Sequence, residues 1–180
     1  MTATHRSWLA STEWLDRGSP QSMVGANMAF SRKVLAKVPG FDPELGPGAS
    51  GFGDDGLFSS QLLAAGFRIH DGMDTSVEHH FEVSRLARAS WLSAAEKRGY
   101  SNAYRGHHWE HWGCRLGWLK VPRARAMLEA WRLRNRGQVA EEGCPVEELD
   151  LVFQLAMARG HLKESRRLRN YDLHGLSKLR

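Results

Sequence analysis

The chain has 180 residues, 42% of them hydrophobic, and this length favours one domain, or a domain with an appendage, built around a buried core. The sequence contains no apolar run of roughly 18 residues that could cross a membrane, and residues 1–14 lack the apolar stretch of a secretion signal. Only Cys114 and Cys144 are present, which excludes a disulfide framework and a paired-thiolate metal site. The composition therefore predicts a cytoplasmic globular protein with two reduced thiols.

The formal charge of +5 is arranged in blocks along the second half of the chain. Residues 115–136 hold seven basic side chains against the single acidic Glu129, residues 141–150 hold five acidic ones, and residues 159–180 again hold seven basic ones. Clustered Lys and Arg attract anionic lipid head groups or nucleic acid, although a solvated helix face is the simpler explanation of any one block. Because no nucleic-acid recognition motif accompanies the charge, we expect no nucleic-acid partner.

The first forty residues predict short elements separated by turns. Residues 1–20 read as an entry segment that closes on the turn signal Gly18-Ser19-Pro20. Residues 23–24 fit a short strand, and Ser31 fits the cap of a short helix over residues 32–38. These elements lead into the part of the chain that carries the clearest functional pattern.

The next segment combines a flexible loop, a helix and two short strands. Four glycines and a proline between residues 46 and 53 predict a loop, because so flexible a backbone disfavours a regular element. A helix with apolar residues at helical spacing begins at Asp54. Residues 67–70 alternate as a strand does, and residues 75–77 can form another.

Beyond Phe81 the pattern is helical. One helix begins near Val83 and ends near Gly99, another covers residues 123–134, and a further pair covers residues 146–158 and 161–169. We therefore expect two parts, which divide the chain into residues 1–112 and a basic helical extension over residues 113–180.

Asp54 and Asp55 are the strongest candidates for a chemical role. Inverting sugar transfer requires a carboxylate that takes the proton of an acceptor hydroxyl as its oxygen attacks the anomeric carbon. At the start of a helix the dipole stabilises a negative charge by roughly 0.3–1 kcal/mol per group. For an isolated pair of aspartates a capping role is the simpler explanation, so the surrounding pattern decides.

That pattern consists of GANMAF at residues 25–30, GFD at 40–42, GDD at 53–55 and VEH at 77–79. In this order the motifs resemble the acceptor-side half of the catalytic domain of a family-two inverting glycosyltransferase, over roughly the first 105 residues. The resemblance implies an α/β fold of the GT-A type, truncated to short strands and helices. It also implies transfer of a sugar from a nucleotide-sugar donor to an acceptor hydroxyl, which a carbohydrate or a lipid-linked molecule would supply.

The resemblance assigns roles to individual residues. Asp55 matches the catalytic base, and Asp54 stands in the place of the usual Glu beside it. His79 matches a ligand of the divalent metal, Mn or Mg, that accompanies the donor diphosphate, and His80 is its rival. The expected substrate contacts are Asn27, Gly51 and Gly53.

One part of the family pattern is missing. Relatives bind the donor with a preceding half that carries an Asp-x-Asp motif, and no such motif lies before Gly25. We therefore expect weak or no transfer by this chain alone, and a metal only if a second polypeptide completes the donor site.

Two other patterns keep alternatives open. His107 and His111 would share a helix face and suggest a metal site, although an amphipathic segment with interleaved tryptophans explains them more simply. Trp118 and Trp131 lie among basic residues, so the tail could dock on an anionic membrane at the inner face, or cap the core. The alternative function is accordingly a noncatalytic module that binds a membrane or a protein through its basic, Trp-containing tail.

Overall fold

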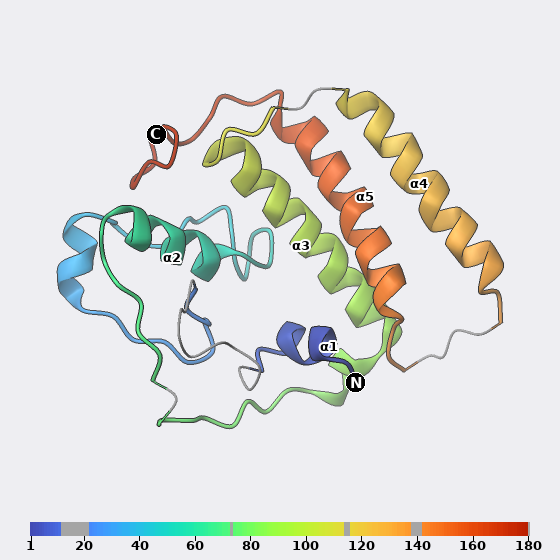
Figure 1. The fold of residues 1–180 in the computed structure, drawn as a ribbon, viewed down its shortest axis with the longest axis horizontal. Coiled ribbons are helices and arrows are strands. Elements are labelled where there is room, and N and C mark those ends of the chain that lie inside the picture. Colours follow the sequence, from blue (N-terminus) through green and yellow to red (C-terminus); the bar gives the residue numbers. More distant parts are fainter. Residues whose placement is uncertain (12–21, 73, 114–115, 138–141, 180) are drawn as a thin grey trace.

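The computed structural model describes residues 1–11, 22–72, 74–113, 116–137 and 142–179. These residues form helices joined by long irregular segments (Figure 1). The elements in chain order are α1 (Ala3–Trp8), η1 (Arg32–Ala36), α2 (Asp54–Ala64), η2 (Val83–Leu86), α3 (Arg88–His108), α4 (Gly117–Arg134) and α5 (Val146–Glu164), where η marks a 3-10 helix.

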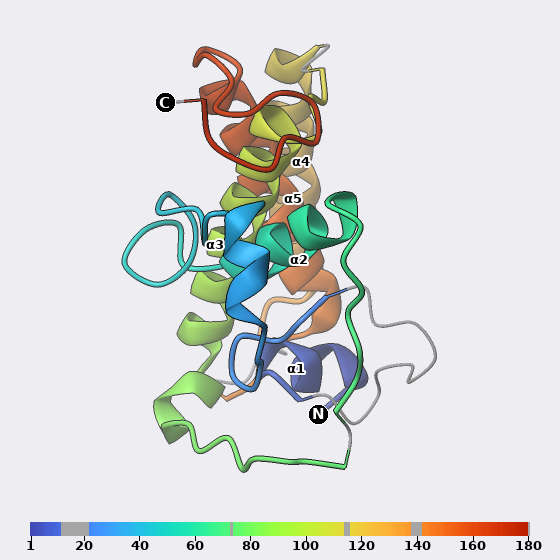
Figure 2. The same ribbon diagram turned by 90° about the vertical axis from the view of Figure 1, so that its left-hand side faces the viewer.

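The three long helices lie side by side, with α5 between α3 and α4 (Figure 1). Two glycines allow α3 and α5 to approach closely. A Cβ on Gly99 would come within 2.5 Å of the Phe153 carbonyl oxygen, and one on Gly160 within 2.6 Å of the Ala103 Cβ. The helices α1 and α2 lie on the other side of α3 from α4 (Figures 1 and 2).

The predicted α/β fold of the GT-A type is wrong for the described residues. They contain no sheet, and the one bridge joins Ala87 to Glu142. The predicted strands at residues 23–24, 67–70 and 75–77 are extended or irregular, with no neighbouring strand beside them. A strand is stable only when a neighbour pairs its backbone N–H and C=O groups, and alternating side chains alone do not provide one.

The segments predicted to be helical are helical, but several of the predicted helix ends are wrong. The first long helix continues through Gly99 to His108, because this glycine is a close contact with α5 and not a stop signal. The predicted pair after residue 146 is the single helix α5, in which Gly160 has the same packing role. Ser31 caps η1 as expected, with its Oγ 3.3 Å from the Lys33 backbone nitrogen.

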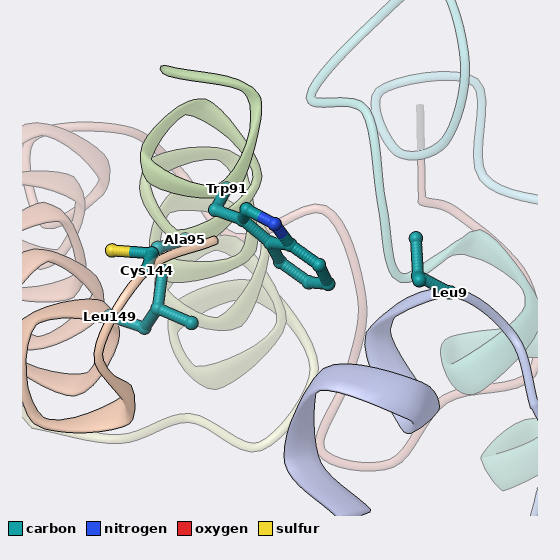
Figure 3. Close-up of a cluster of buried hydrophobic side chains, with 5 residues drawn as sticks. All are labelled: Leu9, Trp91, Ala95, Cys144 and Leu149. Carbon is teal, nitrogen blue, oxygen red and sulfur yellow. The ribbon is translucent and has the colours of Figure 1, made fainter. Parts of the chain in front are cut away.

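A buried apolar cluster joins the N-terminal ends of α3 and α5 to the end of α1. It comprises Leu9, Trp91, Ala95, Cys144 and Leu149. Figure 3 shows Trp91 reaching from α3 toward Leu9, while the other three side chains gather between α3 and α5. Cys144 is a free thiol, and burial raises its pKa to about 11.

A network of buried polar residues fixes the C-terminal segment to the GFD motif. The side chain of Asp42 is fully buried; Tyr104 and Tyr171 each donate a 2.7 Å hydrogen bond to its Oδ2, and Lys178 lies 2.7 Å from its Oδ1. Burial alone would raise the pKa of Glu44, but hydrogen bonds from Lys178 and Arg167 outweigh burial and lower it to about 2. The motif therefore has a structural function, because it anchors the end of the chain.

The histidines near the end of α3 belong to the same anchor. The Nε2 groups of His107 and His111 each donate to a backbone carbonyl, of Arg167 and Tyr171 respectively, at 3.1 and 3.0 Å. These bonds explain the pair without a metal ion. The predicted turn at residues 18–20 and Cys114 lie outside the described residues, and the proposed division at residue 112 stays a prediction.

Candidate functional site

A pocket of about 990 Å³ lies between the start of α2, one face of α3 and the end of α1. Its lining combines carboxylates, arginines and aromatic rings, from parts of the chain far apart in sequence. The residues that matter for its chemistry are Trp8, Phe52, Asp54, Asp55, Arg98 and Ser101.

Asp55 is held in a defined orientation at this pocket. Its Oδ2 accepts a 2.9 Å hydrogen bond from the backbone N–H of Gly25, and its Oδ1 accepts one of 2.7 Å from Gly56. A carboxylate has about four lone-pair positions, so each oxygen keeps the capacity to accept a further proton or hydrogen bond. The GANMAF and GDD motifs thus meet, although Gly25 and Asp55 are 30 positions apart in the chain.

Asp54 points in another direction. A Cβ on Gly46, whose φ is +74°, would lie 2.6 Å from the Asp54 carboxylate. Both aspartates occupy the first turn of α2, where free amides and the dipole favour negative charge. Asp55 is the better candidate of the two for proton transfer, because the amides of Gly25 and Gly56 fix the orientation of its carboxylate at the pocket.

The glycine loop forms one wall of the pocket. Gly46 accepts a 2.7 Å hydrogen bond from the N–H of Gly51, which closes the loop on itself. Gly51 and Gly53 both line the pocket and both have left-handed φ angles, +95° and +87°. A Cβ at Gly51 would meet only the flexible side chain of Lys97, at 2.9 Å, so it is the left-handed conformation that favours glycine there.

Two of the predicted site residues lie elsewhere. Asn27 is exposed and is not among the described residues that line the pocket, although Ala26 and Met28 are. His79 donates a 3.0 Å hydrogen bond from Nδ1 to the carbonyl of Leu9, outside the lining. Its rival His80 pairs with Glu78 at an exposed position.

The described residues do not fit a metal site made by the protein alone. No group of three His, Cys, Asp or Glu side chains comes together in that part of the chain. The Mn or Mg ion that would accompany the donor remains a prediction.

Arg98 is the residue that sequence reasoning missed. Its guanidinium lies between two aromatic rings, 4.8 Å from the Trp8 ring centroid and 4.6 Å from that of Phe52. Burial lowers its pKa, and the nearby Asp55 carboxylate acts in the opposite direction. A signal existed, because the polar residues 98, 101, 102 and 105 follow helical spacing, but the predicted helix ended near Gly99 before most of them.

The outer helix α4 presents a second notable surface. Leu128 is buried and Trp131 half-buried on its inner side, whereas Trp118 and Leu133 are 66% and 62% exposed. The described helices include none that is both long and apolar enough to cross a membrane. The two roles considered for this segment are packing on the core and docking on a membrane. They therefore concern opposite sides of α4.

Comparison with known protein families, with curated proteins and with solved structures finds no match for this chain.

Proposed function

We propose that the pocket beside α2 is the acceptor site of an inverting sugar transferase, in which Asp55 is the catalytic base. The observation that carries the proposal is the position of Asp55, which is oriented by the amide of Gly25 and borders a pocket large enough for a sugar. Aromatic rings and hydrogen-bonding groups in the lining, Trp8 and Ser101 among them, suit the apolar faces and hydroxyls of a carbohydrate.

In the proposed reaction an acceptor hydroxyl binds beside Asp55. Its oxygen forms a bond to the anomeric carbon of the donor, the bond from that carbon to the diphosphate oxygen breaks, and the proton passes to the Asp55 carboxylate. Asp54 and the glycine loop shape the acceptor side.

The proposal is tested with purified protein, Mg²⁺ or Mn²⁺, and a panel of nucleotide sugars and saccharide acceptors. We expect Asp55→Asn to abolish any transfer, because the amide cannot accept the proton. The matched control is Asp150→Asn, which changes an exposed carboxylate on α5 and should leave transfer unchanged. Transfer that survives in Asp55→Asn would rule out this residue as the base.

A separate measurement tests the acceptor site when the chain alone transfers nothing. Saccharides are titrated into the protein, and the indole signals of its tryptophans are followed by NMR. We expect the Trp8 signal to move in the wild type and to move less in Phe52→Ala, since both rings line the pocket. No shift with any saccharide would count against a carbohydrate site.

The exposed face of α4 favours a second candidate function, the docking of the chain on an anionic membrane. Leu119, Ala126 and Leu133 lie on the outward side of the helix, and basic residues such as Arg123 and Arg125 flank them. Apolar and indole groups insert at the head-group level while arginines attract lipid phosphates. This arrangement supports membrane docking on grounds independent of the pocket.

Co-sedimentation with vesicles tests this second function. We expect binding to vesicles that contain phosphatidylserine, less binding at high salt because the charges are screened, and little to phosphatidylcholine alone. Leu133→Ser should weaken binding, whereas Leu168→Ser removes an even more exposed leucine outside α4 and should not. Absence of binding at low salt would exclude membrane docking.

A further inference from the structure

Arg98 differs from the other arginines that are partly covered by the fold. Arg88 and Arg132 both pair with Glu148, and Arg105 pairs with Glu110. The guanidinium of Arg98 makes no ion pair or hydrogen bond with the described residues, and its Nε is buried without a partner. No acidic side chain among the described residues therefore compensates its positive charge by direct contact.

Two aromatic rings contact the Arg98 guanidinium where a carboxylate would otherwise pair with it. The rings of Trp8 and Phe52 attract the guanidinium through cation–π interactions, and they cover part of its surface from water. Removing a charge from water costs free energy unless hydrogen bonds to an opposite charge compensate. Asp55 is near enough to attract Arg98 electrostatically, but no ion pair joins them.

The surroundings are suited to a ligand that supplies the missing charge. Arg98 lines the pocket that also contains Asp55, and the hydroxyl of Ser101 and the amide of Asn102 follow on the same helix face. The contacts with the two rings fix the position of the guanidinium. Its planar fork of N–H donors matches the two oxygens of a carboxylate or phosphate. A ligand that fills the pocket can therefore contact both Arg98 and Asp55.

We propose that Arg98 forms an oxyanion subsite, so that the molecule bound at Asp55 carries a phosphate or a carboxylate in addition to its reacting hydroxyl. This inference rests on the proposed function, and it narrows the acceptor to an anionic sugar, such as a sugar phosphate or a uronic acid. Asp55 would lie against the hydroxyl, and Arg98 against the charged group. The subsite thereby fixes which end of the acceptor reaches the base.

The test is a titration of the full chain with inorganic phosphate, a hexose phosphate, a hexuronate and the neutral hexose, followed through the Trp8 indole signal by NMR. We expect both charged sugars to bind more tightly than the neutral one. Arg98→Met should weaken binding of the charged ligands by about tenfold or more, as expected when hydrogen bonds to a charged group are lost. Comparison of the hexose phosphate with the hexuronate identifies which oxyanion is preferred.

Two controls make the result specific. Arg68→Met removes an exposed arginine outside the pocket and should leave binding unchanged. Arg98→Met also removes the cation–π contacts with Trp8 and Phe52, so the midpoint of urea unfolding is measured to show that the variant is folded under the conditions of the titration.

The outcomes separate the subsite from the proposed reaction. Asp55→Asn should preserve or strengthen binding of inorganic phosphate, since it removes a nearby negative charge, even if the chain proves to have no transferase activity. Conversely, equal binding of charged and neutral sugars, or unchanged phosphate binding in Arg98→Met, would refute the oxyanion subsite and leave the role of Asp55 open to its own test.

Discussion

The hydroxyl of Tyr171 donates a 2.7 Å hydrogen bond to Oδ2 of Asp42, a residue 129 positions earlier in the chain. Tyr104 donates to the same oxygen, and Lys178 pairs with the other. Asp42 thereby joins the GFD motif, α3 and the C-terminal segment at one fully buried carboxylate. This junction fixes the end of the chain beside α2, where Gln61 and Trp109 also donate to the carbonyl of Gly175.

Tyr171→Phe should destabilise the fold by about 1–3 kcal/mol, because Asp42 loses one of its donors while it stays buried. The measurement is the free energy of unfolding in urea. Tyr100→Phe is the matched control, since the hydroxyl of Tyr100 makes no hydrogen bond with the described residues, and it should change the stability little. Equal effects of the two changes would contradict the importance of the Asp42 junction.

Glu148→Ala should cost about 3–5 kcal/mol. Its fully buried side chain lies 2.6 Å from the Arg88 guanidinium and 2.9 Å from that of Arg132, so it connects α5 to α3 and α4. The loss would leave two guanidinium groups without their carboxylate. Glu147→Ala changes the neighbouring exposed residue and should have little effect on thermal unfolding, the quantity to be compared.

Gly99→Ala should destabilise the protein even though alanine favours helices more than glycine does. A Cβ there would meet the Phe153 carbonyl oxygen at 2.5 Å and the Ala156 Cβ at 2.7 Å, so α3 and α5 would have to separate. At Gly56 in α2 a Cβ meets nothing within 4 Å, and Gly56→Ala should stabilise by up to about 1 kcal/mol. Changes of opposite sign in the free energy of urea unfolding of the two variants would verify the close crossing of α3 and α5. Changes of equal sign would contradict it.

His108 should make the fold less stable in mild acid. Burial lowers the pKa of its imidazole, despite the hydrogen bond from Nε2 to Glu164, and the positive charge of Arg167 and the neighbouring His107 act in the same direction as burial. The unfolded chain binds a proton at His108 near its ordinary pKa of about 6.5, while the folded state stays neutral to lower pH. The free energy of unfolding should therefore fall as the pH decreases below about 6.5.

The measurement is the stability at pH 7.5 and at pH 5.5 of the wild type and of His108→Gln. The variant lacks this titrating group, so its stability should decrease less between the two pH values. His5→Gln, which changes a histidine outside the His108 network, should retain the wild-type dependence. An unchanged pH dependence in His108→Gln would show that this histidine is not the sensitive group.

The sequence by itself determined the local features near the proposed site. The glycine content of residues 46–53 excluded a regular element, and apolar spacing after Asp54 specified a helix with both carboxylates in its first turn. These are properties of neighbouring residues, which backbone freedom and helical periodicity control directly. They placed Asp54 and Asp55 at the start of a helix, and Gly51 and Gly53 in the loop before it.

Only the tertiary structure decided what lies opposite them and whether the extended segments pair. Residues 67–70 carry an alternating pattern, but strand formation needs a partner that the pattern does not supply. Local rules predict that the helix ends at Gly99. In the structure this glycine lets α5 pack closely against α3, the helix continues, and Arg98 lines the pocket. The rings of Trp8 and Phe52 contact that guanidinium from positions distant in the sequence. Such contacts follow from tertiary packing, because local propensities do not determine which distant surfaces are buried against each other.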